Sequence, residues 1–145
     1  MTVSDENETR ILQKAEYVQE AVAVLSRKQS LDEGTYRHSR EQRAIVEREF
    51  QTAIEACLDI AGILITSIDI PIAETNAGRF RQLEEFGILS QKTSSQMQKA
   101  AGFRNVLAHN YGDDIDDKVV YHHLQNELKW FVQYLREVRE YLENE

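Results

Sequence analysis

Hydrophobic residues recur at three- and four-residue steps along most of this 145-residue chain, which is the period of amphipathic helices. The first stripe predicts a helix over residues 6–26, which the polar residues 27–34 end. A second stripe predicts a longer helix over residues 37–66. The stripes consist of Ile11, Ala15, Val18, Val22 and Leu25, and of Val46, Phe50, Ala53, Cys57, Ile60, Ala61 and Leu64.

A break, a short helix and a further long helix follow. Residues 69–71 end the second helix, because Pro71 disfavours helical backbone in the residue before it. A short helix carrying Phe80, Leu83 and Phe86 is expected to close at Gly87, a residue suited to the left-handed conformation past a helix end. Ser90 can cap the next helix, which runs to about residue 108. Its core-facing residues are predicted to be Met97, Ala100, Ala101 and Val106.

The last stripe is the cleanest in the sequence. It follows a turn cluster, residues 109–114, and Asp114 or Asp116 can cap its helix. It consists of Val120, Leu124, Leu128, Phe131, Leu135, Val138 and Leu142. The whole pattern predicts an all-α fold, an antiparallel bundle of four long helices and one short helix, in a single domain over residues 1–145.

Composition supports long helices and a reducing compartment. One proline and six glycines are too few for a turn-rich all-β architecture. The single cysteine, Cys57, cannot form an internal disulfide, and its place in an apolar stripe favours a buried small residue over a reactive thiol. The longest uncharged apolar run, residues 60–68, is far shorter than the ~20 residues of a membrane span. We therefore expect a cytoplasmic protein without a membrane segment.

Several signals for binding sites fail on spacing or charge. The net charge of −8 argues against broad wrapping of nucleic acid, although a small basic site remains compatible with it. The acidic residues 113–117 lack the glutamate of a calcium loop, and His122 and His123 are adjacent, which favours surface histidines over metal ligands. Trp130 and Tyr134 are better explained by bundle packing or a dimer face than by base stacking. No metal or cofactor is predicted.

Arg104 and His109 are the candidates for chemistry. On a continuous helix they would lie about 140 degrees apart and would not share a face. If the helix ends near Ala108, with Asn110 or Gly112 supplying a reversal, the His109 ring can fold back toward Arg104.

Tyr111 then lies just outside this pair. A permanent cation, a titratable imidazole and a phenol in one cluster suit phosphodiester chemistry. The structural alternative is that Arg104 caps the helix carbonyls and that His109 or Tyr111 is ordinary turn packing.

The order Arg-x-x-x-x-His-x-Tyr between two helices resembles the signature of the HEPN superfamily, in particular the HepT-type toxins of HepT/MntA toxin–antitoxin systems. The resemblance extends to residues 55–61, 80–89 and 97–111 and to the final helix, and so covers residues 6–142. It implies a homodimeric, metal-independent endoribonuclease that attacks RNA through the ribose 2′-hydroxyl and leaves a cyclic phosphate.

The resemblance also assigns roles to residues. His109 would be the general acid or base, Arg104 would hold the scissile phosphate, and Asn105 would be an auxiliary polar contact. The implied partner is a minimal nucleotidyltransferase antitoxin that adenylylates Tyr111. The alternative of another class is a non-catalytic helical module that binds and regulates a nucleotidyltransferase, and a structural bundle with a fortuitous motif comes last.

Overall fold

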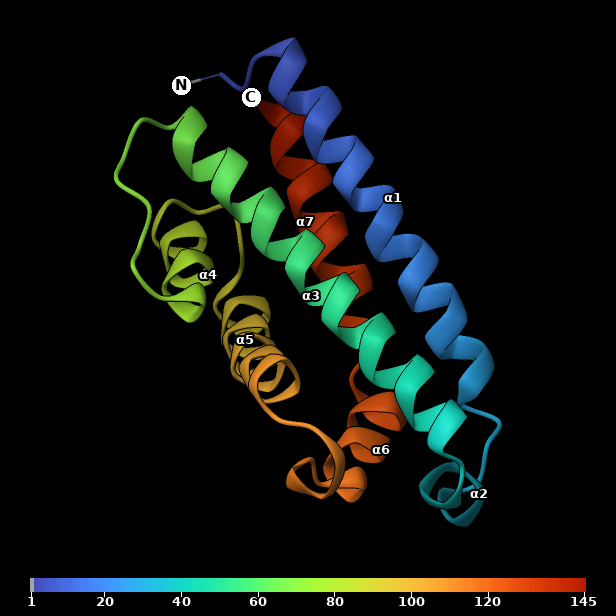
Figure 1. The fold of residues 1–145 in the computed structure, drawn as a ribbon. Coiled ribbons are helices and arrows are strands. Elements are labelled where there is room, and N and C mark those ends of the chain that lie inside the picture. The colour runs from blue at the N-terminus through green and yellow to red at the C-terminus, as the bar shows by residue number, and fades with distance from the viewer. Residues whose placement is uncertain (1) are drawn as a thin grey trace.

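The computed structural model describes residues 2–145 and is helical almost throughout (Figure 1). Across these residues seven α-helices and one 3₁₀ turn follow one another without a strand. They are α1 (Asp5–Lys28), α2 (Glu33–His38), α3 (Arg40–Ser67), α4 (Asn76–Glu85), α5 (Gln91–His109), η1 (Gly112–Asp114), α6 (Asp117–Asn126) and α7 (Lys129–Asn144). The all-α prediction is confirmed, whereas the count of four long helices and one short helix is wrong.

An additional short helix, α2, lies between α1 and α3, across the end of the polar stretch and the predicted start of the second helix at residue 37. The Asp32 carboxylate accepts a hydrogen bond from the Thr35 N–H at 2.7 Å and begins this helix. Ser39 is extended, and its hydroxyl accepts from the Gln42 N–H at 3.2 Å, so that α3 begins at Arg40. Two side-chain caps within eight residues therefore set the starts of α2 and α3 in a region that no hydrophobic stripe marks.

The predicted last helix is divided into α6 and α7 near Asn126. The Asn126 side chain donates to the His122 carbonyl at 3.0 Å and competes with the helical bonds there. The N–H groups of Trp130 and Phe131 bond to carbonyls three residues back instead of four, each at 3.2 Å. Of the two caps considered for this region, Asp116 begins α6 by accepting from the Lys118 N–H.

The predictions for the short helix α4 and for the residues that follow it are confirmed except for one residue. Phe80 and Leu83 are buried as expected, whereas Phe86 lies at the C-cap of α4 and is half exposed. Gly87 has a φ of 72°, the left-handed conformation predicted for it. The Ser90 hydroxyl accepts from the Thr93 N–H at 3.2 Å and caps α5, which confirms that prediction too.

The core is organised around α3, which packs on α1, α4 and α5 (Figure 1). Every residue of its predicted stripe is buried. Residues outside the stripe are buried as well, because α4 and α5 cover a further side of this helix: Ile54, Ala56, Leu58, Ile63 and Ile65. By length and composition α3 is the one helix of residues 2–145 that could cross a membrane, but 61% of its most apolar window is buried in the bundle.

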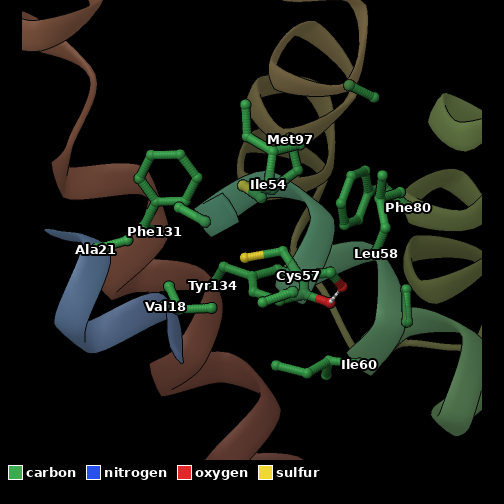
Figure 2. Packing of buried hydrophobic residues seen from close by; sticks show 14 of the residues in the cluster. Val18, Ala21, Ile54, Cys57, Leu58, Ile60, Phe80, Met97, Phe131 and Tyr134 are labelled. Atoms are coloured by element: carbon green, nitrogen blue, oxygen red, sulfur yellow. Dashed lines mark hydrogen bonds between the residues drawn. The ribbon is translucent and has the colours of Figure 1, made fainter. Parts of the chain in front are cut away.

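Cys57 lies in the middle of this core, as Figure 2 shows. Its thiol is fully buried, and burial raises its pKa. The Tyr134 hydroxyl of α7 donates to the Cys57 carbonyl at 2.8 Å and joins α7 to α3. The interpretation of Cys57 as a buried apolar residue is confirmed.

Candidate functional site

Two apolar side chains set the rotation of α5 about its axis. Phe103 and Leu107, four residues apart, are both buried. The Phe103 ring stacks on His123 of α6 at 4.1 Å between centroids and meets Phe50 of α3 edge-on at 5.3 Å. Val106, predicted to face the core, is instead 43% exposed. Because Phe103 and Leu107 occupy the buried face of α5, the side chains of Arg104, Asn105 and His109 lie on its other faces.

Arg104 reaches across to α3. Its Nη2 lies 2.9 Å from Glu55 Oε1, and its Nη1 donates to Asn105 Oδ1 at 3.5 Å. Its side chain is 24% exposed, and its buried Nε has no hydrogen-bond partner. The guanidinium is thus held in place by one carboxylate but keeps donors that this carboxylate does not use.

The end of α5 is capped by Asn110 and not by Arg104. Asn110 donates twice to the Val106 carbonyl, from its backbone N–H at 3.1 Å and from its side-chain Nδ2 at 2.9 Å. This arrangement removes the alternative in which Arg104 serves as the cap. The guanidinium of Arg104 is therefore not used to cap α5.

His109 is the last residue of α5, and its side chain is exposed. Because α5 continues through His109, the expected fold-back of its ring toward Arg104 is wrong. The two residues share one helix and diverge by about 140 degrees around its axis. No hydrogen bond or ion pair joins their side chains in the described part of the chain.

Tyr111 projects into solvent beyond the helix end. Its side chain is 83% exposed and its backbone is extended. The Tyr111 carbonyl accepts from the Asp114 N–H at 3.2 Å, which begins the 3₁₀ turn η1, and Gly112 supplies a positive φ of 60°. Ile115, buried at the end of this turn, fixes the loop to the bundle. The loop therefore holds the tyrosine where another protein can reach it.

Asn105 joins this region to α4. Its Oδ1 accepts from Asn76 Nδ2 at 3.4 Å. Beside this contact is a cavity of about 390 Å³ between α3, α4 and α5. It is lined by Glu55, Leu58, Asp59, Asn76, Arg79 and Arg104. Sequence reasoning gave no role to Glu55, Asn76 or Arg79. Glu55 and Asp59, the two charged positions in the apolar second half of α3, were a signal that this half has an exposed stripe.

The two adjacent histidines differ, and the interpretation of both as surface residues is wrong for one of them. His122 is exposed and lies 3.8 Å from the Glu127 carboxylate. His123 is half-buried, and burial lowers its pKa. Tyr134 is fully buried, which confirms bundle packing for that residue. Across residues 2–145 no cluster of three His, Cys, Asp or Glu side chains is arranged to hold a metal ion.

Comparison with known proteins gives the family. A family model described as ribonuclease HepT-like matches residues 11–138. The chain belongs to the ribonuclease HepT-like family. A relative named tRNA nuclease HepT, from Aphanizomenon flos-aquae, is 33% identical over 113 residues, 78% of this chain and 75% of the relative. A relative named mRNA nuclease HepT, from Shewanella oneidensis, is 28% identical over 85 residues, 59% of this chain and 63% of the relative.

Solved structures show the same fold. A toxin–antitoxin structure with AMP-PNP has a chain that matches with a TM-score of 0.84 at 20% identity, covering 91% of this chain and 98% of that one. The tri-AMPylated HEPN toxin of Shewanella oneidensis, in complex with an MNT antitoxin, matches with a TM-score of 0.81 at 21% identity, covering 90% and 97%. YutE of Bacillus subtilis, a cytosolic protein of unknown function, matches at 0.82 and 17% identity, covering 99% and 94%.

Proposed function

We propose that this member of the HepT-like family is the toxin of a toxin–antitoxin system, a cytoplasmic endoribonuclease neutralised by a nucleotidyltransferase antitoxin. One observation carries the proposal: Arg104, Asn105 and His109 lie in the last two turns of α5 and Tyr111 just beyond them, three of the four exposed and Arg104 with unused donors. Relatives named as tRNA and mRNA nucleases support RNA as the substrate class.

The proposed chemistry needs only groups of the protein and the RNA. Arg104 binds the scissile phosphate through the guanidinium donors that Glu55 leaves free, and Asn105 adds a polar contact. The ribose 2′-oxygen attacks phosphorus while the bond to the 5′-oxygen breaks, which leaves a 2′,3′-cyclic phosphate. His109 takes the 2′-hydroxyl proton or supplies one to the leaving oxygen. No metal ion takes part in this scheme.

A homodimer completes the proposed site. Within one chain Arg104 and His109 point from the same helix in directions about 140 degrees apart, so a single α5 does not aim both at one phosphate. A second copy whose α5 end faces the first would place one chain's Arg104 near the other's His109. Light scattering should give a mass near twice 16.8 kDa at micromolar concentration. A monomer with full nuclease activity would contradict the dimer.

Tyr111 is the proposed site of control. At 83% exposure its hydroxyl is accessible to an antitoxin that transfers an adenylyl group. The new phosphate would compete with the substrate phosphate for Arg104, and the attached nucleoside would obstruct the site. Inhibition would then occur without unfolding.

The chemistry is tested with purified protein and an RNA that it cuts. Cleavage should persist in EDTA, stop when the ribose at the cut carries no 2′-hydroxyl, and be lost in Arg104→Ala, with only the small drop in melting temperature that loss of the Glu55 ion pair brings. A protein that cuts the 2′-deoxy substrate, or that needs a divalent ion, would refute the scheme. A protein that binds its nucleotidyltransferase but cuts no RNA would favour the non-catalytic module.

A further inference from the structure

A groove with an excess of cations leads away from Arg104 across the face formed by α5, α3, α4 and α1. Two cavities, of about 390 and 360 Å³, adjoin because Arg79 and Asp59 line both. We call them together the basic groove. Its charged residues are Arg10, Lys14, Glu55, Asp59, Arg79 and Arg104.

The floor of the basic groove is one stripe of α3. Glu55, Asp59, Gly62 and Thr66 recur at steps of four, three and four residues and therefore share a helix face, about 16 Å long at 1.5 Å per residue. In Figure 1 α3 has α1 on one side and α4 and α5 on the other. The two cavities that share Asp59 and Arg79 thus lie along this one face of α3.

The charge of the basic groove is opposite to that of the protein. Its charged residues are four cations and two carboxylates, whereas the whole chain has 17 Lys and Arg against 25 Asp and Glu. A local excess of positive charge favours the binding of anions here, although the chain as a whole has a net charge of −8.

Arg79 and Arg10 are the two of these cations that have no carboxylate partner among residues 2–145, and Arg79 is the nearer of the two to Arg104 because Arg79 and Arg104 line the same cavity. Arg104 and Lys14 each have a carboxylate, Glu55 at 2.9 Å and Asp59 at 3.1 Å. Arg79 forms no ion pair within residues 2–145, and its Nη1 contacts only the Leu58 carbonyl, at 3.4 Å. Its buried Nε has no hydrogen-bond partner.

The floor beneath Arg79 is a glycine. A Cβ added at Gly62 would lie 3.4 Å from the Arg79 Nη1, so a larger side chain would occupy the space into which the guanidinium extends. The guanidinium thus has unused donors and open space beside it.

We infer that the basic groove binds the RNA backbone beyond the scissile phosphate, with Arg79 as the next phosphate ligand and with Lys14 and Arg10 further along. The inference rests on the proposed ribonuclease function, because it extends the substrate path from Arg104. RNA is favoured over a protein partner because cations outnumber carboxylates four to two among the charged residues of the lining. Of the exposed large hydrophobic residues, only Ile72 lines the groove, and a protein partner usually needs more such anchors.

The test measures binding of a fluorescein-labelled oligouridylate to full-length protein carrying His109→Ala, so that the probe stays intact. In this background Arg79→Gln is compared with Arg81→Gln. Both residues are on α4 and both changes remove one charge, but Arg81 contacts Gln98 outside the groove. Arg79→Gln should weaken binding roughly tenfold. It should also reduce the slope of log affinity against log salt by roughly 0.7, the value for one phosphate contact of a single strand.

Further variants make the test specific. Arg81→Gln should leave the slope of log affinity against log salt unchanged. Arg79→Lys, which keeps the charge, should have the wild-type slope, whereas Arg79→Gln should have a smaller one. On α1, Lys14→Gln should lower the slope and Lys28→Gln, at the far end of the same helix, should not. The melting temperature of each variant shows whether it loses binding through unfolding. If Arg79→Gln unfolds, the binding of the folded Arg79→Lys variant decides whether the charge at residue 79 contacts the probe.

The outcomes separate this inference from the proposed function. If the wild type cuts RNA but Arg79→Gln binds the probe as Arg81→Gln does, the groove is wrong and the ribonuclease stands. If Arg79→Gln weakens only the complex with a nucleotidyltransferase antitoxin, the groove is a protein interface and the inference fails. If the wild type neither binds nor cuts RNA, the proposed function fails with it.

Discussion

Tyr134 and Tyr111 place the same side chain in opposite surroundings. Tyr134 of α7 is fully buried, with its hydroxyl bonded to the Cys57 carbonyl at 2.8 Å and its ring edge-on to Phe80 at 5.5 Å. Tyr111 is 83% exposed on the loop after α5. Burial raises the pKa of the Tyr134 hydroxyl well above its usual value, so this phenol stays protonated and inaccessible.

The difference separates two regions with two tasks. The core around Cys57 and Tyr134 fixes the positions of the helices, whereas the end of α5 displays Asn105, His109 and Tyr111 at little cost to packing. Changes in the core should therefore alter stability and leave the chemistry of each folded molecule alone. Changes at the end of α5 should do the reverse.

The largest effect is expected for His109→Ala. His109 is the proposed general acid or base, and removing such a group should lower the cleavage rate by roughly 10²- to 10⁴-fold. The side chain is exposed and makes no hydrogen bond within the described residues, so the melting temperature should change by no more than about 2 °C. A cleavage-rate assay and a thermal melt measure the two quantities. A variant with a much lower melting temperature and an unchanged cleavage rate would contradict the assignment of His109 to the site and not to the core.

Phe80→Ala should show the opposite pattern. Phe80 is fully buried against Tyr134, and truncation of a buried phenylalanine costs about 3–5 kcal/mol in the free energy of unfolding. Urea unfolding measures the loss. Cleavage per folded molecule, measured well below the lower melting temperature, should stay near the wild-type value; a loss of cleavage beyond the unfolded fraction would mean that the core and the site are coupled.

Matched tyrosine variants sharpen the comparison. Tyr134→Phe removes the hydrogen bond to Cys57 and should cost about 1 kcal/mol of stability. Tyr111→Phe should change stability by less than about 0.5 kcal/mol, because its hydroxyl is in solvent. Equal losses in chemical denaturation would show that Tyr111 also has a structural role.

The smallest effect concerns acid stability and Glu137. Burial alone would raise its pKa, but hydrogen bonds from Ser90, Thr93 and Gln133 outweigh burial and hold the pKa below its usual value. Its stabilising contribution is therefore present above about pH 4 and is lost as the pH falls through the lowered pKa. Glu137→Gln should be less stable at neutral pH and should lose less stability than the wild type on acidification. Urea unfolding of both proteins at neutral pH and at a pH below about 4 measures these two differences. An equal loss of stability on acidification in the two proteins would contradict the prediction.

Local and periodic features of the sequence predicted much of the fold. The apolar period predicted the buried stripe of α3, and Gly87 and Ser90 predicted a helix end and a helix start from their own side-chain properties. Period alone missed α2, because that helix lies where no apolar stripe runs and begins at the Asp32 cap. It also missed the break at Asn126, because the side-chain bond of Asn126 interrupts a continuous apolar stripe there. Such helix boundaries can be predicted from sequence only when each polar side chain is considered as a hydrogen-bond partner for the backbone groups of a continuous helix.

The candidate site was predictable as a set of residues but not as a geometry. The motif named Arg104, His109 and Tyr111, whereas the fold-back that would join the first two within one chain is wrong. The Glu55 partner of Arg104 lies 49 residues away in the sequence, and its contact depends on how α5 packs on α3. Contacts of this kind come from tertiary packing, which no local pattern encodes.

The most direct test of the account is to map the adenylyl group on protein produced together with its nucleotidyltransferase antitoxin. Intact mass and peptide mapping should show adenylyl increments that include Tyr111, none on the buried Tyr134, and loss of the Tyr111 increment in Tyr111→Phe. Tyr17, which is 55% exposed on α1, is the control for exposure alone. Modification at Tyr17 with Tyr111 untouched would contradict the claim that the end of α5 is the functional site.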